Sequence, residues 1–481
     1  MSAPPLVSVI IPAYNAAPSL PATLRSVLDQ TLKDFEAIVV DDGSSDTTAD
    51  IVRQIDDPRL RLLVHETNLG LHQARNTAIR AARGDVLAFL DADDLFHPDK
   101  LHAHVDLLRK RPTLGCTYNA RFDLHYSSEK IRGLWRPPAA LSLSDVLLGF
   151  PLAPSDIVTV KHWAFEVGLW DEQHSFYGGE YIFLGRLWLG GCKFASVDRA
   201  LNYRRYHSGR PYHDVAGGCA SELAAQQKVF ADPRVPEDVR RLRDVAFGNT
   251  YLVWSCHALV QNETALGQHL LQAAVRLDPS IIENGGRKLL GQLLQHATAD
   301  EKQDHESLLA SIFAQLPPEL AWLSAQHPRA IAQGCLARGT RAVMWGDAAD
   351  GQRHFARAAA LGAEIDQPFV QRLTYELLSY ERECGEAAAD TVRRALLPFL
   401  KQVGGATAGR ALNGCCALNR AFTSYRNQRY REVPARVIRA FVNDPRYLLN
   451  RGAFSILLRS LARAGRTAAA DYRTRAASPA R

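Results

Sequence analysis

The sequence predicts an α/β domain with a largely parallel sheet in its first half, followed by an all-α region. Three observations support this fold class. Short β-branched runs alternate with stretches of helical spacing in the first half. Acidic or aromatic residues follow several of these runs, as is typical of the ligand-binding edge of a parallel sheet. Beyond about Ala220 strand signals disappear, and alanine, leucine and arginine dominate.

Length and composition limit the classes of protein that the chain can represent. With 481 residues it is too long for one ordinary core, so we expect two or three domains. The net charge of +6 is modest, and no basic stripe interleaved with aromatic residues indicates a nucleic-acid partner. The eight cysteines show no CxxC spacing, which favours reduced thiols inside a cell. Neither a signal-peptide pattern nor an apolar run of about 18 residues is present, so we expect a cytoplasmic protein.

Periodicity predicts each element of the first half in turn. Apolar, β-branched runs predict strands over residues 6–12, 35–40, 60–65 and 86–90. Helical spacing and caps predict helices over residues 20–30, 47–54, 70–82 and 98–111. Repeated strand–helix–strand units with short connections predict a parallel sheet with helices on both faces. Residues 134–155 are proline-rich and are expected to be irregular, whereas 156–170 is expected to form a strand and a short helix.

The stretch over residues 85–94, DVLAFLDADD, ends a strand in three carboxylates, Asp91, Asp93 and Asp94. Carboxylates this close raise each other's pKa unless a cation or a set of donors lies among them. Mg²⁺ or Mn²⁺ would suit them, because these ions take oxygen ligands and complete their shell with water and phosphate. For an isolated motif, the alternative is an acidic cap on the helix that starts near Pro98.

Three segments, VSVIIPAYN, FEAIVVDDGSSD and ETNLGLHQARNTAIRAARGDVLAFLDADD, resemble the nucleotide-binding half of family 2 glycosyltransferases, which are inverting enzymes of the GT-A type. The resemblance runs from about Val7 to His207. Neither GxGxxG nor GxxxxGK[ST] is present, which disfavours a dehydrogenase or a P-loop enzyme. The resemblance implies a Rossmann-like GT-A domain that moves a sugar from a nucleotide-diphosphate donor, first of all a UDP-sugar. The acceptor would be a glycan or a lipid-linked acceptor in envelope or exopolysaccharide synthesis.

The resemblance also implies a role for individual residues. Those expected to bind the nucleotide sugar are Pro12, Ala13, Tyr14, Asp42, Asn68, Gly70, Arg75, Asp91, Ala92, Asp93 and Arg205. Tyr14 would stack beside the base, Asp42 would accept hydrogen bonds from base or ribose, and Arg75 would donate to phosphate or base oxygens. A divalent cation, Mn²⁺ or Mg²⁺, would be held by Asp93, with His207 as a further ligand. The alternatives are a turn cap for Asp42, a surface position for Arg75 and a structural role for His207.

The catalytic base departs from the family pattern. The family has a glutamate-aspartate pair whose aspartate deprotonates the acceptor hydroxyl, and this chain has Gly179-Glu180 at that place. Glu180 is therefore the expected base, with one methylene more reach. Asp171 and Glu172 remain competing candidates for the base, and an N-terminal helix position is the alternative role for Glu180.

The second half contains three similar stretches, ALVQNETALGQHLLQAAVRLDPS, AVMWGDAADGQRHFARAAALGAE and SYRNQRYREVPARVIRAFVNDPR. Each reads as a helix, a polar turn and a second helix, with the turns at Asn262, Gly346-Asp347 and Asn427. They resemble tetratricopeptide-like helical hairpins. An irregular helical domain without repeats is the alternative.

We therefore expect a GT-A domain over residues 1–219, an all-α domain over 220–462 and a basic tail without ordered structure over 463–481. Arginines dominate the tail, where Asp471 alone opposes them, so it could touch the inner membrane; an inert, solvated tail is the alternative. The helical half could also bind a protein partner. A second functional hypothesis is a scaffold protein whose front half has lost catalysis.

Overall fold

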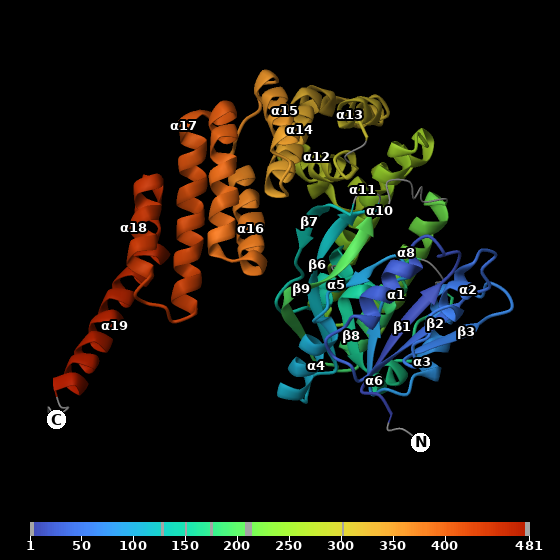
Figure 1. Cartoon of the computed structure of the whole chain (residues 1–481). Coiled ribbons are helices and arrows are strands. Elements are labelled where there is room, and N and C mark those ends of the chain that lie inside the picture. The colour runs from blue at the N-terminus through green and yellow to red at the C-terminus, as the bar shows by residue number, and fades with distance from the viewer. Residues whose placement is uncertain are drawn as a thin grey trace. The chain divides into compact units, whose positions relative to one another are not determined.

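The computed structural model describes residues 4–126, 129–149, 152–173, 177–206, 214–300 and 303–476, with side chains as far as residue 463. The chain forms two compact units, Met1–Gly334 and Cys335–Arg481 (Figure 1). The boundary predicted at residue 219 falls inside the first unit and stays a prediction. Over the described residues, no helix is both long and apolar enough to cross a bilayer.

The first unit contains a sheet of nine strands among the described residues, in the order β3-β2-β1-β4-β8-β6-β9-β5, with β7 beside β6. The strands are β1 Val7–Ala13, β2 Phe35–Asp41, β3 Leu60–Val64, β4 Val86–Phe89, β5 Leu95–Phe96, β6 Cys116–His125, β7 Ile131–Trp135, β8 Ile157–Val160 and β9 Phe194–Tyr206. The strands β1 to β4 are parallel, which confirms the prediction for this part. β8 is antiparallel to both β4 and β6, so the sheet as a whole is mixed.

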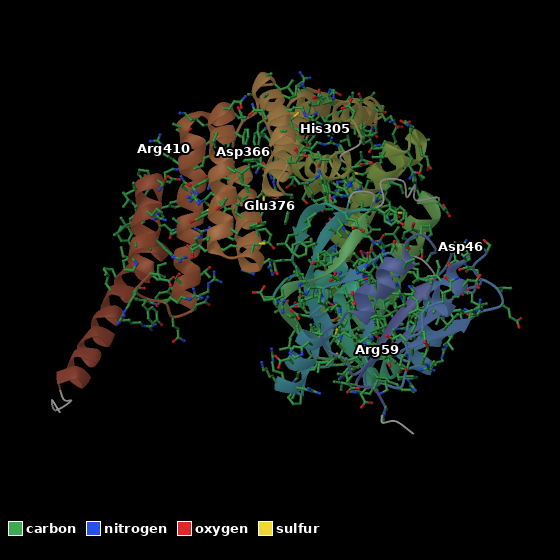
Figure 2. All side chains as sticks on the ribbon, viewed as in Figure 1. Asp46, Arg59, His305, Asp366, Glu376 and Arg410 are labelled. Atoms are coloured by element: carbon green, nitrogen blue, oxygen red, sulfur yellow. The ribbon has the colours of Figure 1, made fainter. Side chains whose placement is uncertain are left out.

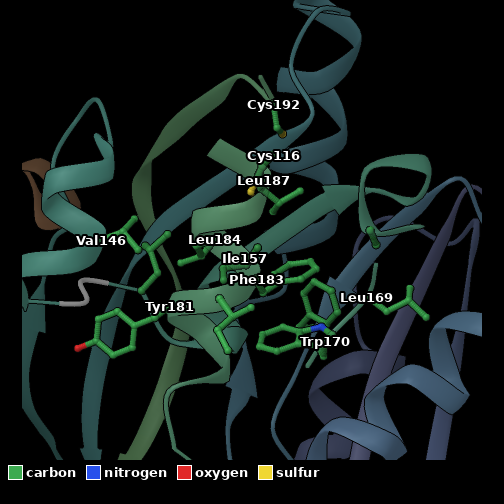
Figure 3. Packing of buried hydrophobic residues seen from close by; sticks show 14 of the residues in the cluster. Cys116, Val146, Ile157, Leu169, Trp170, Tyr181, Phe183, Leu184, Leu187 and Cys192 are labelled. Atoms are coloured by element: carbon green, nitrogen blue, oxygen red, sulfur yellow. The ribbon is translucent and has the colours of Figure 1, made fainter. Parts of the chain in front are cut away.

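Helices cover both faces of this sheet because successive side chains of a strand point to opposite faces. The helices are α1 Leu20–Leu28, α2 Thr48–Arg53, α3 Leu71–Ala81, α4 Lys100–Lys110, α5 Leu143–Gly149, α6 Lys161–Glu166 and α7 Gly179–Leu189. In β1, Val9 and Ile11 pack in a core cluster with α1 and α4, whereas Ile10 packs in another with α3 and α7. Figure 3 shows part of the second cluster, around Trp170 and Phe183.

The segment over residues 134–155 corrects an expectation. It is not irregular throughout, because α5 and the short 3-10 helix Pro154–Asp156 lie within it. Leu143, Val146 and Leu147 have helical spacing and are buried. The prolines at 137 and 138 precede this helix, so they do not interrupt it.

The rest of the first unit is helical. It contains α8 Val215–Phe230, α9 Glu237–Arg240, α10 Arg243–Val260, α11 Thr264–Leu277, α12 Glu283–Ala297 and α13 His305–Ala314, with 3-10 helices at Pro279–Ile281 and Pro318–Gln326. Leu252, Leu271, Leu293 and Leu309 are among the residues that form its core. The expected hairpin with a turn at Asn262 is present, as α10 and α11.

The boundary between the units falls within α14 His327–Met344, and the second unit contains further helices. These are α15 Ala348–Ala360, α16 Gln367–Cys384, α17 Glu386–Arg426, α18 Val433–Asn443, η4 Pro445–Leu449 and α19 Arg451–Ala476. Asp366, labelled in Figure 2, caps α16 by accepting the amide hydrogen of Phe369 at 2.9 Å. α17 is interrupted at Gly405, where φ is 64°. Arg420, after this break, pairs with Asp390, before it, at 2.8 Å, so the two parts of α17 lie against each other.

Candidate active site

The carboxyl ends of β1, β2 and β4 lie next to one another at one edge of the parallel strands. Ala13 ends β1 and pairs with Asp41 of β2, while β4 is bonded to the other side of β1. Pro12 and Ala13 are buried within the strand, whereas the side chain of Tyr14, just beyond it, is 52% exposed. The expected convergence of these strand ends is confirmed, and ligands of open α/β sheets bind at such an edge.

Asp42 orders the loop that leads into α3. Its buried carboxylate accepts hydrogen bonds from Nδ1 of His65 at 2.6 Å and from the amides of Leu69 and Gly70 at 3.0 and 2.8 Å. Gly70 has φ of 102°, a conformation that favours glycine, and Asn68 is exposed. A carboxylate has about four acceptor positions, so the protein uses three of them. One position is left for a base or ribose, whose contact with Asp42 stays a prediction.

Arg75 of α3 is buried against the acidic turn that follows β4. Its Nη2 donates a hydrogen bond to Oδ1 of Asp91 at 2.6 Å, and its Cζ lies 4.6 Å from the ring centroid of Trp170. The side chain is only 1% exposed, so the alternative of a surface arginine is wrong. Nε and Nη1 are buried without a hydrogen-bond partner. Such donors are costly to leave unpaired, and they would suit an anionic or carbonyl oxygen of a ligand.

The acidic turn is stabilised from within by Ser155. The Ser155 hydroxyl accepts the amide hydrogen of Asp91 at 3.1 Å and donates to Oδ2 of Asp94 at 2.6 Å. The amide of Asp94 also donates to the carbonyl of Asp91 at 3.0 Å. Burial, followed by the charges of Asp93 and Asp91, raises the pKa of Asp94 well above its usual range. Asp94 is thus a structural member of the turn.

Arg205 of β9 ties the same turn to α1. Its Nε donates to the carbonyl of Asp93 at 2.5 Å, and its Nη2 donates to the carbonyl of Ser19 at 2.9 Å and to Thr23 Oγ1 at 3.0 Å. Thr23 in turn donates to the carbonyl of Ala92 at 2.9 Å. The structure therefore brings Arg205 to the acidic turn, where it positions Asp93 directly and Ala92 through Thr23, in both cases through the backbone carbonyl. A direct contact of Arg205 with the diphosphate stays a prediction.

Glu180 lies in the first turn of α7, which Gly178 enters with φ of 88°. Its side chain is half-buried. Burial raises the pKa of Glu180, the charges of Asp91 and Glu222 add to this, and Arg75 opposes it. The structure thus places Glu180 within electrostatic range of the Arg75–Asp91 pair, although it is more than 85 residues away in the sequence from either of them.

The competing carboxylates are engaged in contacts within the protein. Asp171 is buried and accepts hydrogen bonds from Arg186 at 3.1 Å and Lys228 at 2.5 Å. Glu172 accepts a hydrogen bond from the side-chain amide of Asn76 at 2.9 Å. Asp171 is thus held by two cationic side chains of the protein, whereas Glu180 forms no ion pair with any residue that the structure describes.

Sequence reasoning did not single out Trp170, Ser155 or His72. Trp170 stacks on Phe183 with ring centroids 4.5 Å apart. The guanidinium group of Arg75 lies over the ring of Trp170. His72 stands three residues before Arg75, a spacing that places both on one side of α3. From this spacing, the sequence could have indicated that His72 lies near the site. The family resemblance marked Trp170 only as the residue before Asp171-Glu172, and nothing marked Ser155, because both reach the site from segments that only the fold brings close.

The oxygen donors of the acidic turn fit a hard divalent cation. Asp91 and Asp93 are partly exposed and offer carboxylate oxygens, which Mg²⁺ and Mn²⁺ prefer. Burial is the main cause of the raised pKa of Asp94, and the charges of Asp93 and Asp91 add to it; a cation beside Asp93 would offset this second part. Asp94 itself accepts the hydrogen bond of the Ser155 hydroxyl. His207, the expected further ligand, lies outside the described residues.

Parallel strands β1 to β4, an acidic turn at the end of β4 and a buried arginine against that turn define a GT-A glycosyltransferase domain. The chain belongs to glycosyl transferase family 2, whose family model, "Glycosyl transferase family 2", matches residues 8–139. The matched residues include the acidic turn and end before Glu180.

Relatives with assigned names support this membership. The chain is 40% identical over 233 residues to WfaP of Escherichia coli, a UDP-Glc:alpha-D-GlcNAc-diphosphoundecaprenol beta-1,3-glucosyltransferase, and the match covers 47% of this chain and 85% of WfaP. WfgD of Escherichia coli carries the same activity name and is 43% identical over 105 residues, which cover 22% of this chain and 42% of WfgD. The match thus spans less than half the length of WfgD.

Among solved structures, the chain is similar to residues 1–349 of TarS from S. aureus in complex with UDP. The two have a TM-score of 0.42 and 16% sequence identity, over 67% of this chain and 88% of that one.

Proposed function

We propose that this protein is an inverting, metal-dependent glycosyltransferase that moves a sugar from a UDP-sugar to a glycan linked to a lipid diphosphate. The names of WfaP and WfgD support this donor and acceptor class, since both name UDP-glucose and a diphosphoundecaprenol-linked sugar. Such an acceptor resides in a membrane, so peripheral contact with the membrane surface is part of the proposal.

The observation that carries the proposal is the pair of unpartnered donors on Arg75. Nε and Nη1 are buried beside the acidic turn, and Asp91 already uses Nη2. A phosphate or ribose oxygen of the donor would satisfy them with charge-assisted hydrogen bonds. Tyr14 would then stack beside the base at the exposed end of β1.

The reaction is a single displacement at the anomeric carbon. The acceptor hydroxyl oxygen forms the new bond to this carbon while the bond from the carbon to the UDP oxygen breaks, so UDP leaves with the bonding electrons. Glu180 takes the proton of the attacking hydroxyl. Its raised pKa makes it a stronger base than an exposed glutamate. A divalent cation at Asp93 would supply positive charge to the departing diphosphate.

Donor binding tests the role of Arg75 directly. Calorimetry of UDP in Mn²⁺ would compare the wild type with Arg75→Met and with Arg80→Met as the matched control. Arg80 lies on the same helix but is more than half exposed and pairs with Glu172. We expect Arg75→Met to lose roughly tenfold or more in affinity, the usual scale of a charged hydrogen bond. Equal affinity in wild type and Arg75→Met would contradict the proposed site.

Transfer itself is tested with a panel of UDP-sugars and a short-chain prenyl diphosphate carrying one sugar. We expect release of UDP and extension of the acceptor with at least one donor. The second candidate function is a scaffold protein without catalysis, which the substitution of Gly179-Glu180 for the family's acidic pair favours. UDP binding without transfer to any acceptor of this class would support that candidate.

A further inference from the structure

Three helical hairpins of the chain share one hydrogen-bond register. Each turn contains a residue with positive φ: Asn262 at 61°, Gly346 at 94° and Gln428 at 60°. In each hairpin, the residue after this one donates its amide hydrogen to a carbonyl five positions earlier than itself. The three bonds are Glu263 to Ala258 at 2.9 Å, Asp347 to Ala342 at 2.8 Å and Arg429 to Ser424 at 2.8 Å. Positions counted from the turn residue therefore correspond among the hairpins.

The first and third hairpins agree further along the chain. An ideal Cβ on Gly248 would lie 2.9 Å from Cβ of Asp278, and one on Gly414 would lie 3.2 Å from Cβ of Asp444. Each aspartate accepts the amide hydrogen two residues further on, at 3.1 Å. The glycine, the turn and the aspartate thus recur with the same spacing, as expected for two copies of one helical repeat. These shared features favour the predicted repeat over a helical region without repeats for these two hairpins.

The third hairpin differs from the other two in the exposed residues of its second helix. Ile438 and Val442 of α18, at the tenth and fourteenth positions after the turn residue, are 55% and 74% exposed. The corresponding residues are Gln272 and Arg276 in the first hairpin and Ala356 and Ala360 in the second. The repeat therefore does not need large apolar side chains at these positions, and their presence in the third hairpin calls for a partner.

The elements that follow continue this apolar character. Leu449, at the end of η4, is 87% exposed. On α19, the side chains of Phe454, Leu458 and Leu461 are exposed at helical spacing and form one stripe along the helix. Seven exposed apolar side chains thus lie within 24 positions, 438 to 461. We call these seven residues, Ile438, Val442, Leu448, Leu449, Phe454, Leu458 and Leu461, the apolar set.

Arginines accompany the apolar set almost without acidic residues. From residue 433 to 463 the chain has six arginines and one acidic residue, Asp444, which pairs with Arg446 at 2.8 Å. Arg439, Arg451 and Arg459 are exposed and form no ion pair within the described part of the chain. Guanidinium groups beside exposed aliphatic side chains are typical of elements that lie in the headgroup region of an anionic bilayer.

We infer that α18, η4 and α19 form a membrane-docking element whose apolar set inserts into the surface of an anionic lipid bilayer. A second copy of this chain fits less well, because it would bring the same excess of arginines to the contact. The inference rests on the proposed function only in choosing a membrane as the partner, since a lipid-linked acceptor lies there. It assigns the contact to the folded hairpin, whereas the sequence alone pointed to the tail after residue 462.

Flotation of the full-length protein with vesicles tests the inference. The vesicles contain about 70% phosphatidylcholine and 30% phosphatidylglycerol, with pure phosphatidylcholine as the neutral comparison. The variant Ile438→Glu/Val442→Glu is compared with Ala356→Glu/Ala360→Glu, which makes the same change of charge at the corresponding positions of the second hairpin. All four positions are at least partly exposed, so both variants should fold, and circular dichroism checks this.

We expect the wild type to float with anionic vesicles and the Ile438→Glu/Val442→Glu variant to lose roughly tenfold or more in partitioning. The control variant should bind within about twofold of the wild type. In about 0.5 M NaCl the wild type should retain part of its binding, because salt screens the arginines but not apolar insertion. No nucleotide sugar is present, so failure here leaves the transfer reaction untouched.

Three outcomes would overturn the inference. The first is a wild type that does not float with anionic vesicles. The second is equal loss in both variants, which would assign the effect to net charge. The third is a wild-type dimer in sedimentation velocity that Ile438→Glu/Val442→Glu abolishes, which would make a second copy the occupant.

Discussion

The imidazole of His72 occupies the space that a side chain at position 179 would need. An ideal Cβ built on Gly179 would lie 1.8 Å from Cε1 of His72. The ring is held there by a 3.0 Å hydrogen bond from Nδ1 to the carbonyl of Asp171. A side chain at position 179, such as the glutamate that the family resemblance would place there, would therefore overlap this ring unless His72 moved. This packing favours glycine at position 179, and Glu180 is the acidic residue in the first turn of α7.

Replacing Gly179 by alanine should destabilise the protein by about 1–3 kcal/mol, because the added methyl group overlaps a buried ring. Thermal or urea unfolding measures the change. The matched control is Gly291→Ala in α12, where nothing lies within 4 Å of an added Cβ. That change should raise stability by up to about 1 kcal/mol, since alanine favours a helix.

Space opened by His72→Ala should partly rescue Gly179→Ala. A double variant that is as unstable as the sum of the two single changes would show that the two side chains do not compete.

Glu180→Gln should keep donor affinity while transfer falls by about a hundredfold or more, the usual scale for removing a general base. The amide keeps the shape of the side chain but cannot accept the proton of the acceptor. Because the pKa of Glu180 is raised, wild-type transfer should also decline, as pH falls, at a pH above the ordinary value of 4.5. Steady-state rates over a range of pH measure both effects.

Three further variants check the assignment of the base. Glu180→Asp restores the family's residue but withdraws the carboxylate by one methylene, so transfer should fall less than in Glu180→Gln. Asp171→Asn and Glu172→Gln should retain more transfer activity than Glu180→Gln. Wild-type transfer by Glu180→Gln, together with loss in either of these two, would move the base to the Asp171-Glu172 pair.

Asp93→Ala should remove the dependence of UDP-sugar binding on Mn²⁺ and weaken it by roughly tenfold or more. Calorimetry with Mn²⁺ and with EDTA measures this. Asp85→Ala, which removes an exposed carboxylate at the start of the same segment, serves as the control and should bind as the wild type does. Equal wild-type affinity in Mn²⁺ and in EDTA would rule out the metal at this site.

The partly buried pair His257–His296 should make the protein sensitive to acid. Their Nε2 atoms lie 3.5 Å apart, and burial together with His296 lowers the pKa of His257 to about 3. The unfolded chain binds a proton near pH 6.5, so it takes up more protons than the folded protein between pH 6.5 and about 3. Stability from this pair is therefore full above about pH 6.5 and declines as pH falls below it.

Between about pH 7.5 and pH 5, this histidine should contribute a loss of about 1–2 kcal/mol. His257→Leu removes the titrating group, so its stability should depend less steeply on pH over the same range. Urea unfolding at both pH values gives the two differences. The same pH dependence in wild type and variant would show that His257 is not responsible.

Much of the fold followed from local patterns in the sequence. The parallel strands β1 to β4 and the helices between them were predictable, because buried strands and amphipathic helices each show their own periodicity. The three hairpin turns were also visible. The order of the remaining strands was not, since β8 enters the sheet between β4 and β6 from a distant part of the chain.

For the candidate site, the sequence by itself determined which residues stand at the strand ends. Tyr14, Asp42 and the turn from Asp91 to Asp94 follow directly from where the apolar runs stop. Only the tertiary structure decided what these groups contact: it buries Arg75 on Trp170 and closes the acidic turn with Ser155. Periodicity reports which face of an element is apolar, whereas contacts between segments that lie many residues apart depend on how those faces pack.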